Sequence, residues 1–244
     1  MLIEHRAYTL QLGATELFWD AQRERGDDGL RPILDRLIGS FATQTGPLDQ
    51  AVSLYRYDSF DDWQSRLFGI YGQAHLQPYF RIVRPLIVRQ ESKFLAPAPL
   101  PELTPHWGNG RDWLPAQGPL FTAARAGSVV EETTLSFAAG GVPACWEAFR
   151  QHALADDAIP LQGLFGVFSS IAGALNQVLL YRHFANAEAC FAHRAALHQS
   201  ARWTSFLRTL APLTAASDSR LLEPSRIVDM SPLFAFGDQA GNSQ

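Results

Sequence analysis

Cysteine is scarce in this chain, and several other features that would point to a function are missing. Cys145 and Cys190 are the two cysteines in 244 residues, and both fall in expected helices, so we expect buried thiols and no disulfide framework. No apolar run approaches the roughly 18 residues of a membrane-spanning helix, so we expect no membrane span. Met1 leads straight into an expected strand, without the charged and apolar regions of a signal peptide, which predicts a cytoplasmic protein.

Charge and histidine spacing argue against two further classes of protein. The net charge is −4 with 18% charged residues and no basic stripe, so we expect no nucleic-acid partner. None of the seven histidines forms an i, i+4 pair, so we expect no metal. There is also no glycine-rich phosphate loop between a strand and a helix. We therefore expect no cofactor.

What the chain does contain is a repeat. The stretch Leu37–Tyr57 recurs as Leu164–Phe184, with Gly39 matching Gly166 at an offset of 127 positions (166 − 39 = 127). A shared offset indicates a duplicated unit. Around residues 51–55 an offset of 126 aligns the letters better, so we expect a one-residue slip that a bulge in one copy absorbs.

Each copy is predicted to fold in the order β-α-β-β-α-β. In the first copy, apolar alternation predicts strands over 2–12, 37–43, 51–57 and 87–95, and helical spacing predicts helices over 14–25 and from 59 onward. Ser59 is a suitable N-cap residue, and Asn186 holds the matching position in the second copy. The two copies thus predict the same local structure.

Four segments follow from this pattern. We expect a first repeat at 1–96, a linker at 97–126, a second repeat at 127–236 and a disordered tail at 237–244. The linker is rich in proline and lacks periodicity, while Trp107 and Trp113 favour a segment that packs against the protein. Phe234 and Phe236 are expected to dock in the same way.

The repeat predicts the overall architecture. A four-stranded antiparallel sheet with both helices on one face leaves its other face bare, and the simplest cover is the sheet of the other copy. We therefore expect an α+β fold in which two ferredoxin-like repeats pack sheet to sheet as a pseudo-dimeric α/β barrel, with a cavity between the sheets. Such a chain needs no partner to fold, so a monomer or a homodimer is expected.

The sequence also resembles the NIPSNAP family, closely over residues 2–100 and loosely over 129–225. The resemblance rests on Glu-His-Arg-Ala-Tyr-Thr-Leu at 4–10 and on matching stretches at 37–41, 46–50, 57–59, 84–86, 90–92 and 97–99. It implies the dimeric α/β-barrel superfamily, which includes cofactor-free monooxygenases, haem-dependent peroxidases and isomerases. It implies a fold more than an activity, because the biochemical role of the family is unsettled.

Polar residues on the first strand are candidate ligand-binding positions. Glu4, Arg6 and Tyr8 share one face by period two, and together they could bind an anion or a carbonyl group and move a proton. The alternative is a structural Glu4–Arg6 ion pair. In the second copy Glu131 repeats Glu4, but Thr133 and Leu135 replace the other two, so a site would exist in the first copy only.

Three more residues complete the candidate set. Tyr55 and Tyr57 share a face of their strand, opposite to Arg56, and periodicity alone leaves open which face meets the cavity. His183 also lies on a strand and could reach the cavity as a base or a haem ligand, or serve as a hydrogen-bonded structural histidine.

Three functions stay open on the sequence alone. The chain could bind a small, partly apolar molecule with a carbonyl or phenol group in the cavity. It could instead be an interaction or assembly module that uses the linker and residues 232–236. It could also be an enzyme like the cofactor-free monooxygenases or isomerases, although no pattern identifies catalytic residues.

Overall fold

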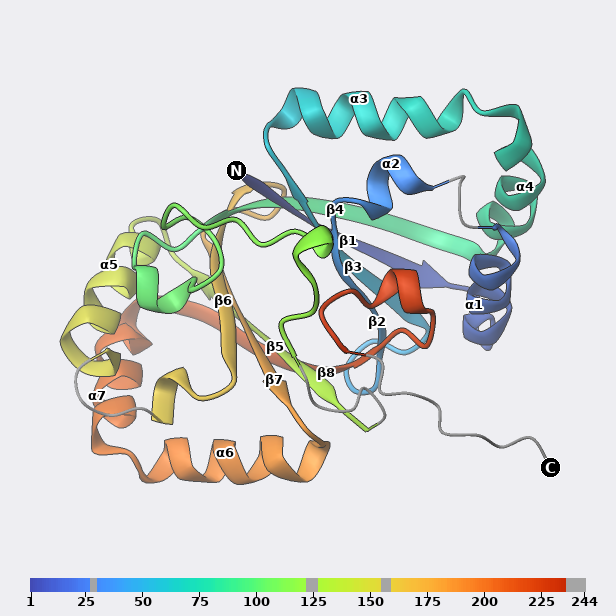
Figure 1. The fold of residues 1–244 in the computed structure, drawn as a ribbon. Helices are drawn as coiled ribbons and strands as arrows, with labels where there is room; N and C mark the ends of the chain where they lie inside the picture. Colours follow the sequence, from blue (N-terminus) through green and yellow to red (C-terminus); the bar gives the residue numbers. More distant parts are fainter. Residues whose placement is uncertain (27–29, 122–126, 155–158, 236–244) are drawn as a thin grey trace. The chain divides into compact units, whose positions relative to one another are not determined.

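Eight strands are hydrogen-bonded in the order β1-β3-β2-β8-β5-β7-β6-β4 and close into a barrel (Figure 1). The computed structural model describes residues 1–26, 30–121, 127–154 and 159–235. The strands of the first repeat are β1 (Leu2–Leu10), β2 (Leu37–Thr43), β3 (Gln50–Tyr57) and β4 (Ile87–Pro97). Those of the second are β5 (Val129–Phe137), β6 (Leu164–Ala172), β7 (Gln177–Phe184) and β8 (Thr214–Pro224). The predicted α+β barrel of two repeats is confirmed.

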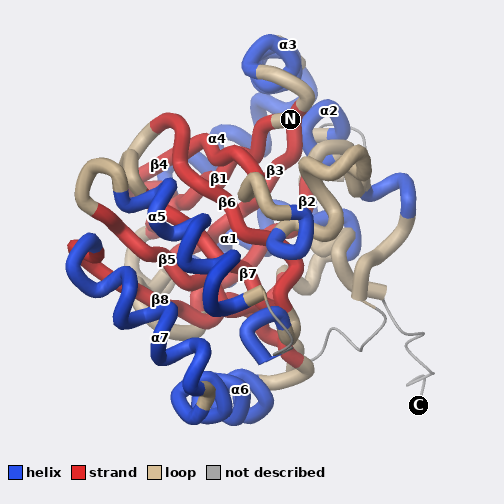
Figure 2. The backbone as a smooth tube through the Cα atoms, turned by 90° about the vertical axis from the view of Figure 1, so that its left-hand side faces the viewer, coloured by secondary structure: helices blue, strands red, loops and turns tan. Residues whose placement is uncertain are grey.

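Helices connect the strands in the predicted order. The first repeat contains α1 (Thr15–Glu24), α2 (Arg31–Leu34), α3 (Phe60–Tyr71) and α4 (Gln77–Leu86). The second contains α5 (Gly141–Ala148), α6 (Ala187–Gln199) and α7 (Ala201–Leu210). A π-helical turn at Phe149–Ala153 extends α5. Figure 2 shows these helices on one side of the strands of the second repeat. Ser59 and Asn186 cap α3 and α6 as expected, because their side chains accept the backbone N–H groups of Asp62 and Ala189.

Two compact units make up the chain, and each combines segments from both repeats. Unit 1 comprises Met1–Ser92, Leu114–Ser128 and Glu223–Gln244, and unit 2 comprises Lys93–Trp113 and Val129–Leu222. Strand β4 therefore begins in unit 1 and ends in unit 2, whereas β8 does the reverse. Unit 1 thus holds the body of the first repeat, and unit 2 holds the body of the second repeat together with the first part of the linker.

The offset of 127 positions holds through strands and helices. In unit 1 the register passes from Leu37 opposite Tyr55 to Gly39 opposite Leu54 across a bulge. In unit 2 the register passes in the same way from Leu164 opposite Arg182 to Gly166 opposite Tyr181. Arg182 thus takes the place of Tyr55, 127 positions earlier. Helices α3 and α6 also begin 127 apart (187 − 60), as do β4 and β8 (214 − 87).

The expected one-residue slip is therefore wrong. The bulge occurs in both copies, so neither copy shifts against the other, and Tyr55 corresponds to Arg182 instead of Tyr181. Glycine beside the bulge is needed for packing, because a Cβ atom on Gly39 would lie 2.7 Å from Cζ of Phe41, and one on Gly166 would lie 2.5 Å from Cε2 of Phe168. The missing Cβ lets each aromatic ring fold back over the backbone.

The segments that follow the two repeats pack in equivalent ways. In unit 2 the N–H of Ala98 donates to the carbonyl of Val167 at 2.9 Å, and in unit 1 the N–H of Ser225 donates to that of Ser40 at 2.8 Å. Trp107 is fully buried among aromatic rings of unit 2, so the linker packs against the protein as predicted. We call residues 225–235, which pack in unit 1, the C-terminal strap. Its Phe234 is buried, whereas Phe236 and the expected disordered tail lie outside the described residues.

Candidate functional site

A buried ion pair lies at the centre of unit 1. Strand alternation places Glu4 and Arg6 on one face of β1, where they are 1% and 3% exposed. Arg6 donates from Nε to Oε1 of Glu4 at 3.0 Å and from Nη2 to Oε2 at 2.7 Å. The carboxylate also accepts from Nε1 of Trp63 at 3.1 Å and from Oγ of Ser92 at 2.9 Å. These bonds compensate the cost of removing both charges from water.

One guanidinium nitrogen of Arg6 has no hydrogen-bond partner in the part of the chain that the structure describes. Within the described residues, its Nη1 atom makes no hydrogen bond, whereas Nε and Nη2 are both bound to Glu4. Its Cζ atom also lies 4.8 Å from the centroid of the Tyr55 ring. Burial alone would lower the pKa of Arg6, but Tyr8, Tyr55 and Glu4 raise it well above its usual value. The guanidinium is therefore fixed in orientation and stays charged.

A pocket of about 60 Å³ in unit 1 opens beside this guanidinium. Its polar lining includes Arg6, Tyr8, Gln22, Ser53, Tyr55 and Tyr79. Apolar side chains from α1–α4 and Met230 of the C-terminal strap complete the wall. Since a cavity needs roughly 10–15 Å³ of this kind of volume to hold one water, the pocket has room for about four or five waters, or for a molecule of about four or five heavy atoms.

Three tyrosines of the pocket are donors, because burial holds their protons. It raises the pKa of Tyr55 to about 12, and it raises the pKa of Tyr71 and Tyr79 as well. Gln22 donates from Nε2 to the hydroxyl oxygen of Tyr79 at 2.6 Å, which leaves the Tyr79 proton to point elsewhere. At neutral pH these phenols donate hydrogen bonds and do not act as bases.

The structure brings five of the seven predicted site residues together. Glu4, Arg6, Tyr8, Tyr55 and Tyr57 share the face that packs on the helices of unit 1, and the rings of Tyr55 and Tyr57 lie 6.1 Å apart. The hydroxyl of Tyr57 is buried without a hydrogen-bond partner in the described chain. The sequence places these residues between two sheets; in the structure they face helices, because α1–α4 pack on this side of β1 and β3.

The other two predicted residues belong to unit 2. Glu131 is buried and accepts hydrogen bonds from Nε of Arg194 at 2.6 Å and from Oγ of Ser219 at 3.2 Å. His183 is half-buried, burial lowers its pKa, and strand alternation places it on the opposite face from Arg182. The two residues therefore share no site with the first five.

Sequence reasoning missed the residues that helices and the C-terminal strap contribute. Gln22 and Tyr79 lie 57 positions apart on α1 and α4, and Met230 comes from the far end of the chain. The sequence does carry one signal for Gln22 and Tyr79. At the equivalent positions of the second repeat, 127 further on, these polar residues are replaced by Phe149 and Phe206. A change from polar to apolar between copies marks a position whose surroundings differ.

The equivalent space in unit 2 is filled with apolar side chains. The offset pairs the polar lining with Thr133, Leu135, Phe149, Leu180, Arg182 and Phe206. Four of these, Leu135, Phe149, Leu180 and Phe206, belong to one buried apolar cluster. The rings of Phe149 and Phe206 pack at 4.5 Å where unit 1 has Gln22 and Tyr79. The polar pocket is thus a property of the first repeat.

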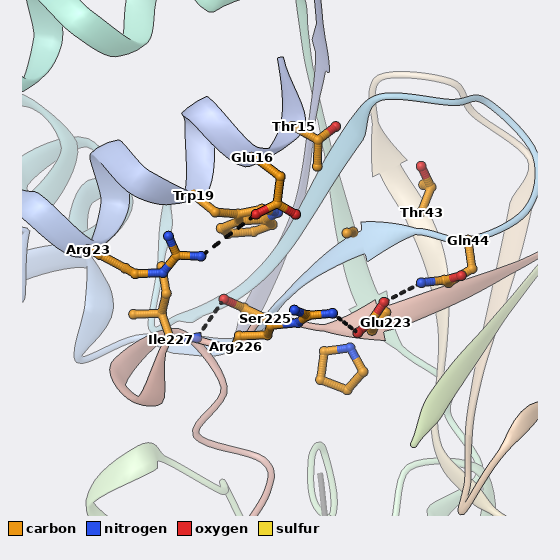
Figure 3. A pocket seen from close by; sticks show the side chains of 12 residues that line it. Thr15, Glu16, Trp19, Arg23, Thr43, Gln44, Glu223, Ser225, Arg226 and Ile227 are labelled. Atoms are coloured by element: carbon orange, nitrogen blue, oxygen red, sulfur yellow. Dashed lines mark hydrogen bonds and ion pairs between the residues drawn. The ribbon is translucent and has the colours of Figure 1, made fainter. Parts of the chain in front are cut away.

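A larger depression of about 190 Å³ lies in unit 1 between α1 and the C-terminal strap (Figure 3). Its charged residues pair with one another, Arg23 with Glu16 at 3.9 Å and Arg226 with Glu223 at 3.6 Å. The side chains of Glu16 and Arg226 are 78% and 71% exposed, and exposed pairs contribute little. The smaller pocket, by contrast, is lined by Arg6, which is 3% exposed. The pocket beside Arg6 is therefore the stronger candidate.

Two other kinds of site are not found in the part of the chain that the structure describes. No three or more His, Cys, Asp or Glu side chains come together in a way that could hold a metal ion. None of the described helices combines the length and apolar character needed to cross a bilayer. Cys145 and Cys190 are free and buried, as predicted.

Comparison with known proteins identifies relatives of each repeat. The NIPSNAP family model matches residues 3–101 and 130–228. A NIPSNAP-like domain protein from Burkholderia xenovorans is 34% identical, with 41% of this chain and 86% of that chain covered and a TM-score of 0.38. A NIPSNAP family protein from Agrobacterium tumefaciens is 30% identical, with 41% and 94% covered and a TM-score of 0.39.

The whole barrel also has solved counterparts. A proposed monooxygenase from Lactobacillus acidophilus is 12% identical, with 92% of this chain and 93% of that chain covered and a TM-score of 0.55. At this identity the likeness shows the fold alone. No curated protein matches the sequence.

Proposed function

The chain belongs to the NIPSNAP family, and from this premise we propose that unit 1 binds a small neutral molecule through a carbonyl oxygen in the pocket beside Arg6. One observation carries the proposal: the first repeat keeps a polar pocket where the second is filled with apolar side chains. Polar groups in place of apolar packing lower stability. Departures of this kind from an optimal core are typical of functional sites.

Charge selects the chemistry of the ligand. Glu4 and Arg6 neutralise each other, and Arg6 is the single charged residue among those lining the pocket. A carboxylate ligand would therefore bring an unpaired negative charge into a buried site, which is costly. A neutral carbonyl oxygen can accept from Nη1 of Arg6 without that cost. The remaining lining offers phenol donors and apolar walls.

The size of the pocket limits both ligand and affinity. The best small ligands gain about 1.5 kcal/mol per heavy atom, so four or five atoms give at most about 6 to 7 kcal/mol. This corresponds to a dissociation constant of about 10 μM at the tightest. Ketones, aldehydes or amides with a short apolar chain meet these limits. Binding therefore has to be measured with millimolar probe concentrations.

Binding is favoured over the two alternatives. The buried phenols hold their protons, and Glu4 is occupied by four hydrogen bonds, so neither group is prepared to abstract a proton. An assembly role for the linker is disfavoured because Trp107 is fully buried within unit 2. Both points support a ligand-binding role for the pocket.

Saturation-transfer NMR with a matched pair of probes tests the proposal. 2-Butanone and propionate have the same number of heavy atoms, but the second is charged. We expect signal from 2-butanone and little from propionate. In the triple variant Tyr8→Leu, Gln22→Phe and Tyr79→Phe, which copies the second repeat, the 2-butanone signal should disappear.

The larger depression supplies the control for this experiment. Glu223→Gln changes that depression and lies outside the lining of the pocket, so it should leave the 2-butanone signal unchanged. Equal 2-butanone signals from the wild-type protein and the triple variant would contradict the proposal. A stronger signal from propionate would contradict the carbonyl assignment.

A further inference from the structure

A second cluster of buried polar side chains lies in unit 2, between β7 and α6. Arg182 and His193 are 2% and 5% exposed. Nε of Arg182 and both ring nitrogens of His193 are buried without a hydrogen-bond partner in the described residues. Buried polar atoms in folded proteins nearly always have a partner, and an exception calls for a bound water or ion.

The charges of this cluster do not balance. Glu131 accepts from Nε of Arg194 at 2.6 Å, whereas its nearest approach to Arg182 is 3.9 Å, at Nη1. Nη2 of Arg182 donates to the neutral carbonyl of Pro160 at 3.2 Å. Among the described residues, one carboxylate therefore serves two guanidinium groups. Arg182 is almost fully buried without an anion of its own, which is unfavourable.

The neighbouring titratable groups supply no compensating charge. The ring of His193 packs against Phe184 at 5.2 Å, and burial together with Arg182 lowers its pKa. Burial raises the pKa of Cys190 to about 11, so this thiol is uncharged at neutral pH. Neutral His193 carries one N–H group that can donate to an anion.

The equivalent place in unit 1 shows no such excess. The offset of 127 pairs Arg182 with Tyr55 and His193 with Arg66. There Glu4 is bound to Arg6 at 2.7 Å, and Asp62 is bound to Arg66 at 2.5 Å. Each guanidinium of that set has its own carboxylate, so the surplus positive charge is a feature of unit 2.

We propose that unit 2 binds a halide-sized, monovalent anion between Nε of Arg182 and a ring nitrogen of His193. The anion would accept from these two N–H donors and would neutralise the unmatched positive charge. A water molecule would satisfy the donors but leave the charge of Arg182 uncompensated, so the anion is favoured. The pocket beside Arg6 plays no part in this inference.

Bromide-soaked crystals of the full chain provide the direct test, because bromide replaces chloride and scatters anomalously. We expect an anomalous peak within hydrogen-bond distance of Nε of Arg182 and of one ring nitrogen of His193. A peak without anomalous signal would identify water and overturn the proposal. The absence of any peak would overturn it as well.

Stability in solution gives an independent measurement. At constant ionic strength, with gluconate replaced by chloride, the unfolding midpoint should rise with the logarithm of chloride concentration. His193→Phe should remove this dependence, whereas Tyr57→Phe, a hydroxyl deletion in unit 1, should keep it. A midpoint that is the same in chloride and gluconate would contradict the site.

Discussion

Glu4 and Glu131 show how a buried carboxylate can be kept in both repeats while its cation changes. Each accepts a hydrogen bond from a serine of the last strand of its repeat, Ser92 or Ser219, and these serines also lie 127 positions apart. The cation that pairs with Glu4 is Arg6, two positions further along β1, whereas the cation that pairs with Glu131 is Arg194 on α6. In the first repeat this arrangement leaves Nη1 of Arg6, a residue that lines the pocket, without a hydrogen bond in the described chain.

Removing only the cation of the buried pair is expected to be costly. Arg6→Met leaves the Glu4 carboxylate buried and unpaired, which should lower the free energy of unfolding by about 3–5 kcal/mol. The double variant Glu4→Leu, Arg6→Met removes both charges and should recover most of that loss. Both can be measured by denaturant titration, and both should lose 2-butanone binding. A double variant as unstable as the single one would show that the unpaired charge is not the cause.

The dependence of protein stability on pH at high pH should report the raised pKa of the buried Tyr55. The pKa of Tyr55 is about 12 in the folded protein against about 10 in the unfolded chain, so the folded state holds this proton longer. The contribution is fully present below pH 10 and is lost as the pH rises to 12, by about 1 kcal/mol per pH unit. Denaturant titrations across this range should show the decline. Tyr55→Phe should make it shallower, and an unchanged slope would contradict the assigned pKa.

At the scale of elements, the C-terminal strap completes the pocket of unit 1. Asp229 accepts two hydrogen bonds from the buried Arg25 at 3.0 and 2.8 Å, and Met230 lines the pocket. Nε of Arg25 donates to Gln22 at 3.3 Å, and Gln22 in turn donates to Tyr79. The strap thus contributes Met230 to the lining of the pocket and is linked through Arg25 to the polar residues Gln22 and Tyr79.

Shortening the side chain of Met230 in the C-terminal strap should change which ketones the pocket binds. Met230→Ala removes apolar packing and should destabilise the protein by about 2–5 kcal/mol, while it deepens the pocket. Saturation-transfer NMR should then detect longer ketones, such as 2-hexanone, that the wild-type protein does not bind. If the variant bound the same ketones as the wild-type protein, Met230 would not define the end of the pocket.

The bulge glycines are expected to be indispensable for packing. Gly39→Ala and Gly166→Ala each place a methyl group against an aromatic ring and should cost about 1–3 kcal/mol. Gly69 on α3 is the matched control, because a Cβ atom there meets nothing within 4 Å. Gly69→Ala should be neutral or stabilise by up to about 1 kcal/mol. Equal effects at Gly39 and Gly69 in denaturant titrations would contradict the role of the bulge.

Local patterns in the sequence predict most elements but not the walls of the pocket. Period-two alternation identifies β1 and β3, and Ser59 identifies the start of α3, because these signals lie within a few residues. Which face of β3 meets the helices is not encoded locally, so the strand pattern left the orientation of Tyr55 open. Gln22, Tyr79 and Met230 meet only through tertiary packing, which no short-range pattern reports.

At the scale of the whole molecule, one duplicated fold carries two different interiors. The offset of 127 positions holds from strand to strand, yet four places that hold polar side chains in unit 1 hold apolar side chains in unit 2. Duplication lets one copy keep a well-packed core while the other keeps a less stable polar pocket. The account therefore rests on an asymmetry between the two units.

A crystal structure of the full chain with 2-butanone bound tests this asymmetry most directly. We expect the ketone in unit 1, with its oxygen about 2.7–3.2 Å from Nη1 of Arg6. We expect none among Leu135, Phe149, Leu180 and Phe206 of unit 2, because these side chains fill the equivalent space. A ketone absent from unit 1, or present equally in both units, would contradict the account.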